Sequence, residues 1–344
     1  MLAVVAVLAV ALPSGGPQGP GVQVLSQKAK RSVIAALGTT DAAGNYDVAF
    51  TLHASSGTTP RPCAVVPVTP GVPAGSAAGP RVYCAGITAP LDVSGHGTVN
   101  EEPYALAVVS TVSTLGPITL YVDGTTVWEL GGGNYGSSLS VSGGVGAGAP
   151  LSGFASLVEG TFGPGPGALT VISLASHNGY LNLEQQAIQR AAPAGSGSVG
   201  GTPVTYYDVT VDVAKLADAA NLTDQERITL QDAVQVLKAA GDSGTKETIG
   251  VDAAGFIREV TSTTRFADGS ALTRHTLFSN FGCAPTVSLP NQPTPPTATT
   301  PPCSSPDTLA SPPTSTTTST PSATSTSTSA SSTTTAPPPT TTSP

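Results

Sequence analysis

The last part of the chain, residues 284–344, consists almost entirely of Pro, Thr, Ser and Ala. It contains no Lys or Arg and a single acid, Asp307. Pro removes backbone donors, and Ser and Thr bury little apolar surface, so nothing offsets the entropy lost on ordering this segment. The composition predicts a disordered tail of the kind found in extracellular stalks, which are often O-glycosylated. Folding must then take place in the residues before it.

The chain begins with a short apolar segment, residues 1–12, which Pro13 ends. Its apolar run of eleven residues would span about 16 Å as a helix, short of the roughly 30 Å of a bilayer core. The length fits a secretory signal with a small-residue cleavage site at Ala9-Val10-Ala11, although the usual basic residues are missing. We expect an exported protein on the outer face of the membrane or in the cell wall. Whether 1–12 is cleaved or is a remnant of an anchor stays open.

After a Gly/Pro linker at 13–21, residues 22–283 are long enough for one large domain. Few charged residues and many Gly, Ala, Val and Thr suit a β-rich domain. The net charge of −8 leaves no basic patch for phosphates, which argues against nucleic acid as a partner.

Four cysteines fit an oxidising compartment. Their spacing suggests that Cys63 pairs with Cys84 and Cys283 with Cys303. Each bond would close a loop of about 20 residues, worth roughly 3 kcal/mol by the chain-entropy argument. Two other connectivities remain open. Because there is no C-x-x-C and no nearby pair of histidines, we expect no metal site.

Periodic patterns predict the elements of the first half. Apolar residues every four positions predict a helix over 22–37, with Leu25, Ala29, Val33 and Leu37 on one stripe and Gly38 as its end. Alternation over 46–52 predicts a half-buried strand. Residues 54–81 are rich in Gly, Pro and Thr and are expected to form a long loop.

Turn signals predict two hairpins farther along. Strands at 118–122 and 126–130 flank Asp123-Gly124, where both residues are expected at positive φ. Segments 169–174 and 180–183 flank Asn178-Gly179 in the same way.

The second half adds a strand over 204–213, a helix and three more strands. Tyr207, Val209, Val211 and Val213 share one face of the first strand. Thr223 and Glu226 form a capping box at the start of the helix, and strands follow at 248–251, 256–264 and 272–281. These elements predict an α+β fold, in which two helices pack on the concave face of a curved antiparallel sheet that remains an unclosed half-barrel.

The candidate motifs for chemistry have simpler interpretations. The G-x-G-x-x-G run at 131–136 lacks a following helix start, so we interpret it as a turn. The four histidines lie at scattered positions. Asp208 and Asp212 would lie about 13 Å apart on one strand, too far for a glycosidase pair, and Glu101-Glu102 is expected to be solvated. We therefore expect no catalytic residues and no cofactor, and a protein that is not an enzyme.

The order of elements resembles that of actinobacterial envelope lipoproteins of the LppX/LprG type, which are similar in turn to the LolA-like carriers. The runs 45–52 and 122–130 resemble the N-terminal half of that family, and 204–216 and 250–258 the C-terminal half. The resemblance implies an unclosed barrel, with helices across its mouth, that binds acyl chains in an apolar cavity. This chain differs in having no lipobox Cys and in its long tail.

From the predicted strands and second helix we place the cavity at six apolar residues: Phe50, Leu120, Trp128, Val209, Val211 and Leu237. The expected partner is a lipid or another apolar small molecule, with an envelope or cell-wall protein as a further candidate. The alternative is a surface interaction or sensor module in which the same residues form a filled core and a protein is the partner.

Overall fold

The structure is a computed structural model of the chain. It describes residues 20–57, 63–66, 81–84, 87, 90–101, 104–112, 116–123, 126–130, 149–150, 165–166, 168–169, 172, 179–239 and 245–288. The chain divides into two compact units, Met1–Pro312 and Pro313–Pro344, and every described residue belongs to the first. The expected signal segment 1–12 and most of the linker and tail lie outside the described residues, so these limits stay predictions.

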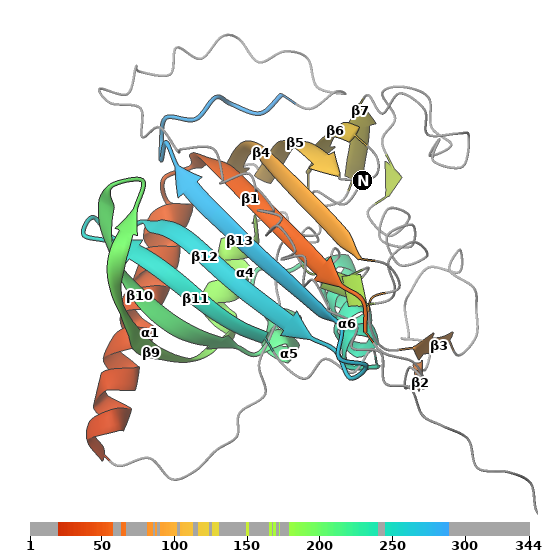
Figure 1. Ribbon diagram of the computed structural model, residues 1–344, viewed down its shortest axis with the longest axis horizontal. Coiled ribbons are helices and arrows are strands. Elements are labelled where there is room, and N and C mark those ends of the chain that lie inside the picture. The colour runs from red at the N-terminus through yellow and green to blue at the C-terminus, as the bar shows by residue number, and fades with distance from the viewer. Residues whose placement is uncertain are drawn as a thin grey trace, which may run out of the picture. The chain divides into compact units, whose positions relative to one another are not determined.

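The domain is built on one eleven-stranded antiparallel sheet (Figure 1). Its strand order is β8-β7-β6-β5-β4-β1-β13-β12-β11-β10-β9, and β8 and β9 form its two edges, so the sheet does not close into a barrel. The predicted α+β class with an unclosed antiparallel sheet is confirmed. The strands are β1 (Asn45–Ser55), β4 (Leu91–Glu101), β5 (Tyr104–Val112), β6 (Gly116–Val122), β7 (Thr126–Leu130), β8 (Ala149–Pro150), β9 (Ile188–Val199), β10 (Thr202–Val211), β11 (Thr245–Asp252), β12 (Ile257–Arg265) and β13 (Ala271–Ser279).

Alternating burial gives the sheet two different faces. In β1 every even-numbered residue from Tyr46 to Ala54 is buried in the main apolar cluster. Phe50 stands opposite Thr276 of β13 on one side and Gly95 of β4 on the other, so the same alternation continues across the sheet. We call the side that carries these buried residues the inward face, and the opposite side the outward face.

The helices pack on the inward face. They are α1 (Pro20–Asp41), α4 (Gly179–Ala187), α5 (Val213–Leu216) and α6 (Asp224–Ala239). α1 packs against β9, β10, β11 and β12, and α4 packs against α1 and α5. Val33 of α1, Leu181 of α4 and Leu237 of α6 all join the cluster that holds the inward strand residues. Figure 1 shows these helices behind the sheet. Two helices were predicted, and α4 and the single turn of α5 add to them.

The first helix is longer than its pattern predicted. Ala29, Val33 and Leu37 are buried as expected, but α1 continues to Asp41, and Gly44 at φ +77° follows it. Gly38 is inside the helix because α4 approaches it closely: a Cβ there would lie 3.4 Å from Gln185 Oε1. The prediction that Gly38 ends the helix was therefore wrong.

Several other local predictions were wrong. Residues 180–183 belong to α4, since Leu181, Glu184 and Ala187 are buried at helical spacing rather than alternating. The expected loop at 54–81 contains two short paired strands, β2 (Cys63–Val66) and β3 (Arg81–Cys84), the latter ending beyond it. The β6–β7 hairpin is confirmed, but pairing of Val122 with Val127 leaves a four-residue turn, and Asp123 has no positive φ.

The second half follows its pattern more closely. At the start of α6 the Thr223 N–H donates to Glu226 Oε2 at 2.8 Å, and the Glu226 N–H donates to Thr223 Oγ1 at 3.3 Å, which confirms the capping box. β11, β12 and β13 confirm the last three strands. Asp212 is the N-cap of α5, so it does not share a strand face with Asp208.

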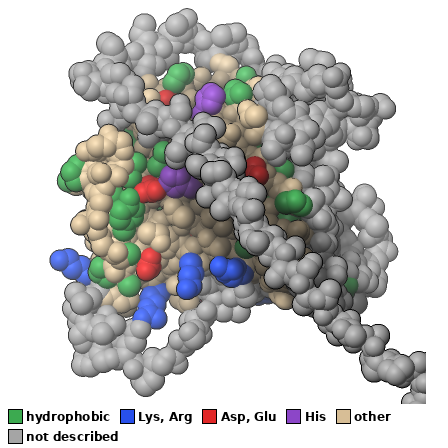
Figure 2. Space-filling view, viewed as in Figure 1, with side chains coloured by type: hydrophobic (Ala, Val, Ile, Leu, Met, Phe, Trp, Pro, Cys, Tyr) green, Lys and Arg blue, Asp and Glu red, His purple; other side chains and the backbone are tan. Residues whose placement is uncertain are grey.

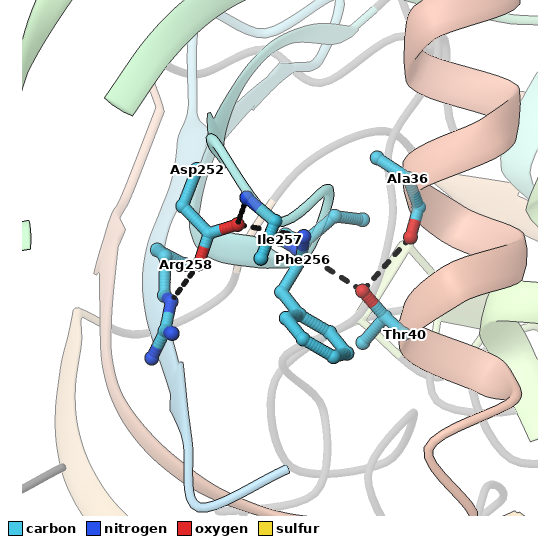
Figure 3. Close-up of polar contacts among 7 residues, drawn as sticks. Ala36, Thr40, Asp252, Phe256, Ile257 and Arg258 are labelled. Carbon is cyan, nitrogen blue, oxygen red and sulfur yellow. Dashed lines mark hydrogen bonds and ion pairs between the residues drawn. The ribbon is translucent and has the colours of Figure 1, made fainter. Parts of the chain in front are cut away.

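A hydrogen-bonded contact fixes α1 against the β11–β12 turn (Figure 3). Thr40 Oγ1 donates to the carbonyl of Ala36 at 2.9 Å and accepts the N–H of Ile257 at 3.0 Å. The turn itself is held by Asp252, whose carboxylate accepts from the Phe256 N–H at 2.9 Å and from Arg258 Nε at 2.6 Å. The C-terminal end of α1 thus has a defined position over the inward face.

Among the described residues, no helix has the length and apolar character needed to cross a membrane.

Candidate functional site

Most of the residues predicted to line a cavity lie together on the inward face. Phe50, Leu120, Val209, Val211 and Leu237 all belong to the main apolar cluster. Leu120 and Leu237 are 0% and 1% exposed. Strands from both halves of the sheet and α6 therefore contribute to one apolar interior. The side chain of Trp128 lies outside the described residues.

A row of polar side chains crosses this apolar interior. Glu247 of β11 stands opposite Ser262 of β12, which stands opposite Arg274 of β13. All three are buried, and Glu247 is only 1% exposed. The next residues along the row are Val209 of β10 and Leu52 of β1, both in the apolar cluster. A charged pair and a hydroxyl thus lie between apolar residues of the inward face.

Glu184 of α4 faces this row. Burial raises the pKa of Glu247, while the positive charge of Arg274 and a hydrogen bond with Glu184 act to lower it. Burial is the larger effect, so the pKa of Glu247 is raised overall. Two carboxyl groups therefore share the neighbourhood of a single guanidinium. We call Glu184, Glu247, Ser262, Arg274 and the adjacent Thr276 the polar row.

Sequence reasoning missed the polar row, although a signal for it exists. Glu247 precedes Ile249 and Val251 on the same face of a strand, and Arg274 lies between Leu272 and Phe278 with the same period. A charged residue at an inward position of an alternating strand indicates a buried charge.

A second buried acid lies at the end of β4. Glu101 was expected to be solvated, but it is only 6% exposed and accepts a hydrogen bond from the Tyr46 hydroxyl. Burial raises the pKa of Glu101 to about 8. Burial, and then the nearby Glu101, also raise the pKa of Tyr104. The fold therefore encloses Glu101, the last residue of β4.

The outward face carries a different polar network. The Tyr206 hydroxyl donates to Glu259 Oε2 at 2.6 Å, and Glu259 Oε1 lies 2.5 Å from His275 Nε2. Hydrogen bonding with His275 lowers the pKa of Glu259, against the opposing effect of burial. The Tyr206 ring lies over Gly250, where a Cβ would be 2.9 Å from Cε1. The network joins β10, β12 and β13 across this face.

Figure 2 shows histidine and acidic side chains near the middle of this view. His53 pairs with Asp92 at 2.6 Å, with both side chains more than half exposed, and His96 is exposed. His177 lies outside the described residues. The part of the chain that the structure describes holds no group of three His, Cys, Asp or Glu residues that could bind a metal ion.

The cysteines are oxidised where they are described. Cys63 and Cys283 are each disulfide-bonded. Cys63 stands directly opposite Cys84 in the β2–β3 pair, and Cys303 lies outside the described residues. The pairing itself stays a prediction.

Several solved structures are similar to this chain. The lipoprotein LppX of Mycobacterium tuberculosis has a TM-score of 0.39 at 10% identity, covering 76% of this chain and 99% of its own. LprF from Mycobacterium bovis has a TM-score of 0.37 at 14% identity, with 77% and 98% covered. The MucA/MucB complex of Pseudomonas aeruginosa has 0.27 at 10% identity, with 75% and 59% covered. No family model matches the chain, and no curated protein matches its sequence.

Proposed function

We propose that the chain is an exported, non-enzymatic envelope protein that holds the acyl chain of a lipid, or another apolar molecule, against the inward face of its sheet. One observation carries the proposal. A continuous apolar cluster extends from Val127 of β7 to Ala191 of β9 across a sheet that is open at both edges. Apolar interiors with a few polar groups are typical of small-molecule sites.

The ends of the chain support export. The apolar segment 1–12 has the length of a secretory signal, and the tail has the composition of a stalk. Disulfide-bonded Cys63 and Cys283 fit an oxidising compartment. The tail would hold the domain away from a membrane or extend through a wall.

Native mass spectrometry of the full chain, purified from an actinobacterial host and then extracted with solvent, tests the proposal. We expect a retained mass that extracts as lipid. Val211→Trp adds bulk at a position that is 1% exposed, so it should lower the amount of retained lipid severalfold while the circular dichroism spectrum is kept. A wild-type protein that carries no bound molecule and takes up no added fatty acid or phospholipid would contradict the proposal.

A second candidate is a surface interaction or sensor module with a filled interior. The burial of the predicted cavity residues favours it, because Leu120, Val211 and Leu237 have almost no exposed surface. A protein partner would then bind an edge or the outward face. Native mass spectrometry that detects no bound molecule, together with unchanged stability on adding lipid, would support this candidate.

A further inference from the structure

The polar row combines burial with unused hydrogen-bonding capacity. Neither carboxyl oxygen of Glu247 has a hydrogen-bond donor of ordinary geometry among the described residues, and the same holds for Thr276 Oγ1. Thr276 lies two residues from Arg274 on the same face of β13 and is 7% exposed. Buried polar atoms without partners are rare, because each loses its hydration without compensation.

The contact between Glu247 and Glu184 does not fill this capacity. Two carboxylates both accept, so they form a hydrogen bond only when one of them carries a proton. In that state the shared proton occupies one oxygen of Glu247, and the other oxygen still has no donor among the described residues. Thr276 can both donate and accept. The row can therefore bind a group that donates to Glu247 and exchanges a hydrogen bond with Thr276.

The charges of the polar row determine which kind of ligand group can bind there. Arg274 supplies one positive charge beside two carboxyl groups. A phosphate or carboxylate entering here would meet both acids, and like charges at short range in a buried site repel strongly. Because the two carboxyl groups in contact share one proton, the pair carries one negative charge, which Arg274 balances, and an uncharged group fits best.

We infer that the polar row binds the uncharged, hydroxyl-bearing head group of an amphiphile whose apolar chain lies along the inward face. Leu52 and Val209, which flank the row in register, offer apolar surface on either side of the head group. A glycerol or sugar hydroxyl has the donor and acceptor pattern that Glu247 and Thr276 require. This inference rests on the proposed function, since it names the class of ligand held by the same interior.

A competition experiment tests it with the full chain. The protein is incubated with equal amounts of a monoacylglycerol, a lysophosphatidic acid and an alkylamine of the same chain length, and native mass spectrometry reads the bound species. We expect the monoacylglycerol to be bound at least about tenfold more than the lysophosphatidic acid. The phosphate of the lysophosphatidic acid would be repelled by the buried carboxyl groups, and a glycerol hydroxyl would not.

Glu247→Leu should reduce that preference to about threefold or less, because it removes the carboxyl group that meets the head group. The matched control is Glu259→Leu, the same change on the next strand but on the outward face, and it should keep the preference. Thr276→Val keeps the shape of the side chain but removes the hydroxyl, and it serves as the test variant if the leucine variant does not fold.

The possible failures are distinct. Binding of amphiphiles with a head-group preference that Glu247→Leu leaves unchanged would overturn this inference and leave the proposed function standing. A preference for the lysophosphatidic acid or for the alkylamine would overturn it as well. Absence of any bound amphiphile on the wild-type chain would overturn both.

Discussion

Glu101 shows how folding can place an acid where its charge is unfavourable. Its side chain is buried, and its Oε2 has no hydrogen-bond partner among the described residues. Burial is the main cause that raises its pKa to about 8, with the Tyr46 hydrogen bond opposing and Asp41 adding to the rise. An unfolded Glu loses its proton near about pH 4.3. Between those values the folded chain binds one proton more than the unfolded chain.

The free energy of unfolding should therefore fall as the pH rises through this window. Glu101 alone contributes a slope of up to about 1.4 kcal/mol per pH unit, and this stabilisation is fully present only below the unfolded pKa. Glu101→Gln removes the titrating group, so its stability should fall less steeply with pH. Urea unfolding of both proteins from about pH 5 to about pH 8 measures the difference. Asp218→Asn, at an exposed acid, is the control and should keep the wild-type slope. If the free energy of unfolding changed with pH equally in wild type and Glu101→Gln, the Glu101 carboxyl would be ionised in the folded chain.

The burial of single residues could be predicted from the sequence to different extents. Phe50, Val209 and Val211 were predictable as inward residues because strict alternation fixes which face they occupy. Glu101 was not, because its burial depends on contact with Tyr46, 55 positions earlier in the chain. Glu247 lies between these cases: its strand period places it inward, but only the fold brings Glu184 and Arg274 beside it.

At the scale of elements, Thr40 joins α1 to the β11–β12 turn. It is fully buried, and its hydroxyl is the acceptor for the Ile257 N–H. Thr40→Val keeps the shape but leaves that N–H without an acceptor, which should lower the free energy of unfolding by about 1–3 kcal/mol. Amide hydrogen exchange at Ile257 should become faster.

Thr39→Val is the matched control for this contact. Thr39 makes the same bond within the helix, to the carbonyl of Ala35, but none to the turn. Its loss should change stability by less than about 0.5 kcal/mol. Equal effects of the two variants would show that the contact with Ile257 contributes nothing to the position of α1.

Elements with one buried face could be predicted from the sequence, whereas elements without such a face could not. α6 has a capping box and a buried stripe, and β11, β12 and β13 alternate, so each was found. β9 was missed because residues 193–198 are exposed on both faces and include Pro193. Its place at the edge of the sheet explains this, since an edge strand tolerates a residue without an N–H. α4 was missed because Asn178-Gly179 favours a hairpin locally, whereas packing against α1 favours a helix.

At the scale of the molecule, the length of tail that can act as a spacer depends on the disulfide pairing. If Cys283 pairs with Cys303, the first twenty or so residues after β13 form a closed loop. The free spacer then begins after Cys303. Its forty or so residues would span roughly 35 Å as flexible coil and up to about 125 Å as polyproline helix. The disulfide pattern would therefore set the length of the spacer.

The structure favours one pattern. Cys63 and Cys84 are direct partners in an antiparallel pair, where Cα atoms lie about 4.5–5.5 Å apart, within the range that a disulfide needs. Since Cys63 and Cys283 are both bonded, we predict that Cys303 is the partner of Cys283.

Tryptic digestion without reduction distinguishes the alternatives. Trypsin cuts after Arg31, Arg81, Arg190 and Arg274, Pro62 protects the bond after Arg61, and the tail contains no Lys or Arg. Cys63 and Cys84 then fall in separate peptides, 32–81 and 82–190, whereas Cys283 and Cys303 share 275–344. We expect mass spectrometry to find the first two peptides linked to each other and 275–344 linked to neither, with a mass two hydrogens below that of its reduced form. A link between 275–344 and either other peptide would contradict the pairing and would tie the tail to the β2–β3 hairpin instead.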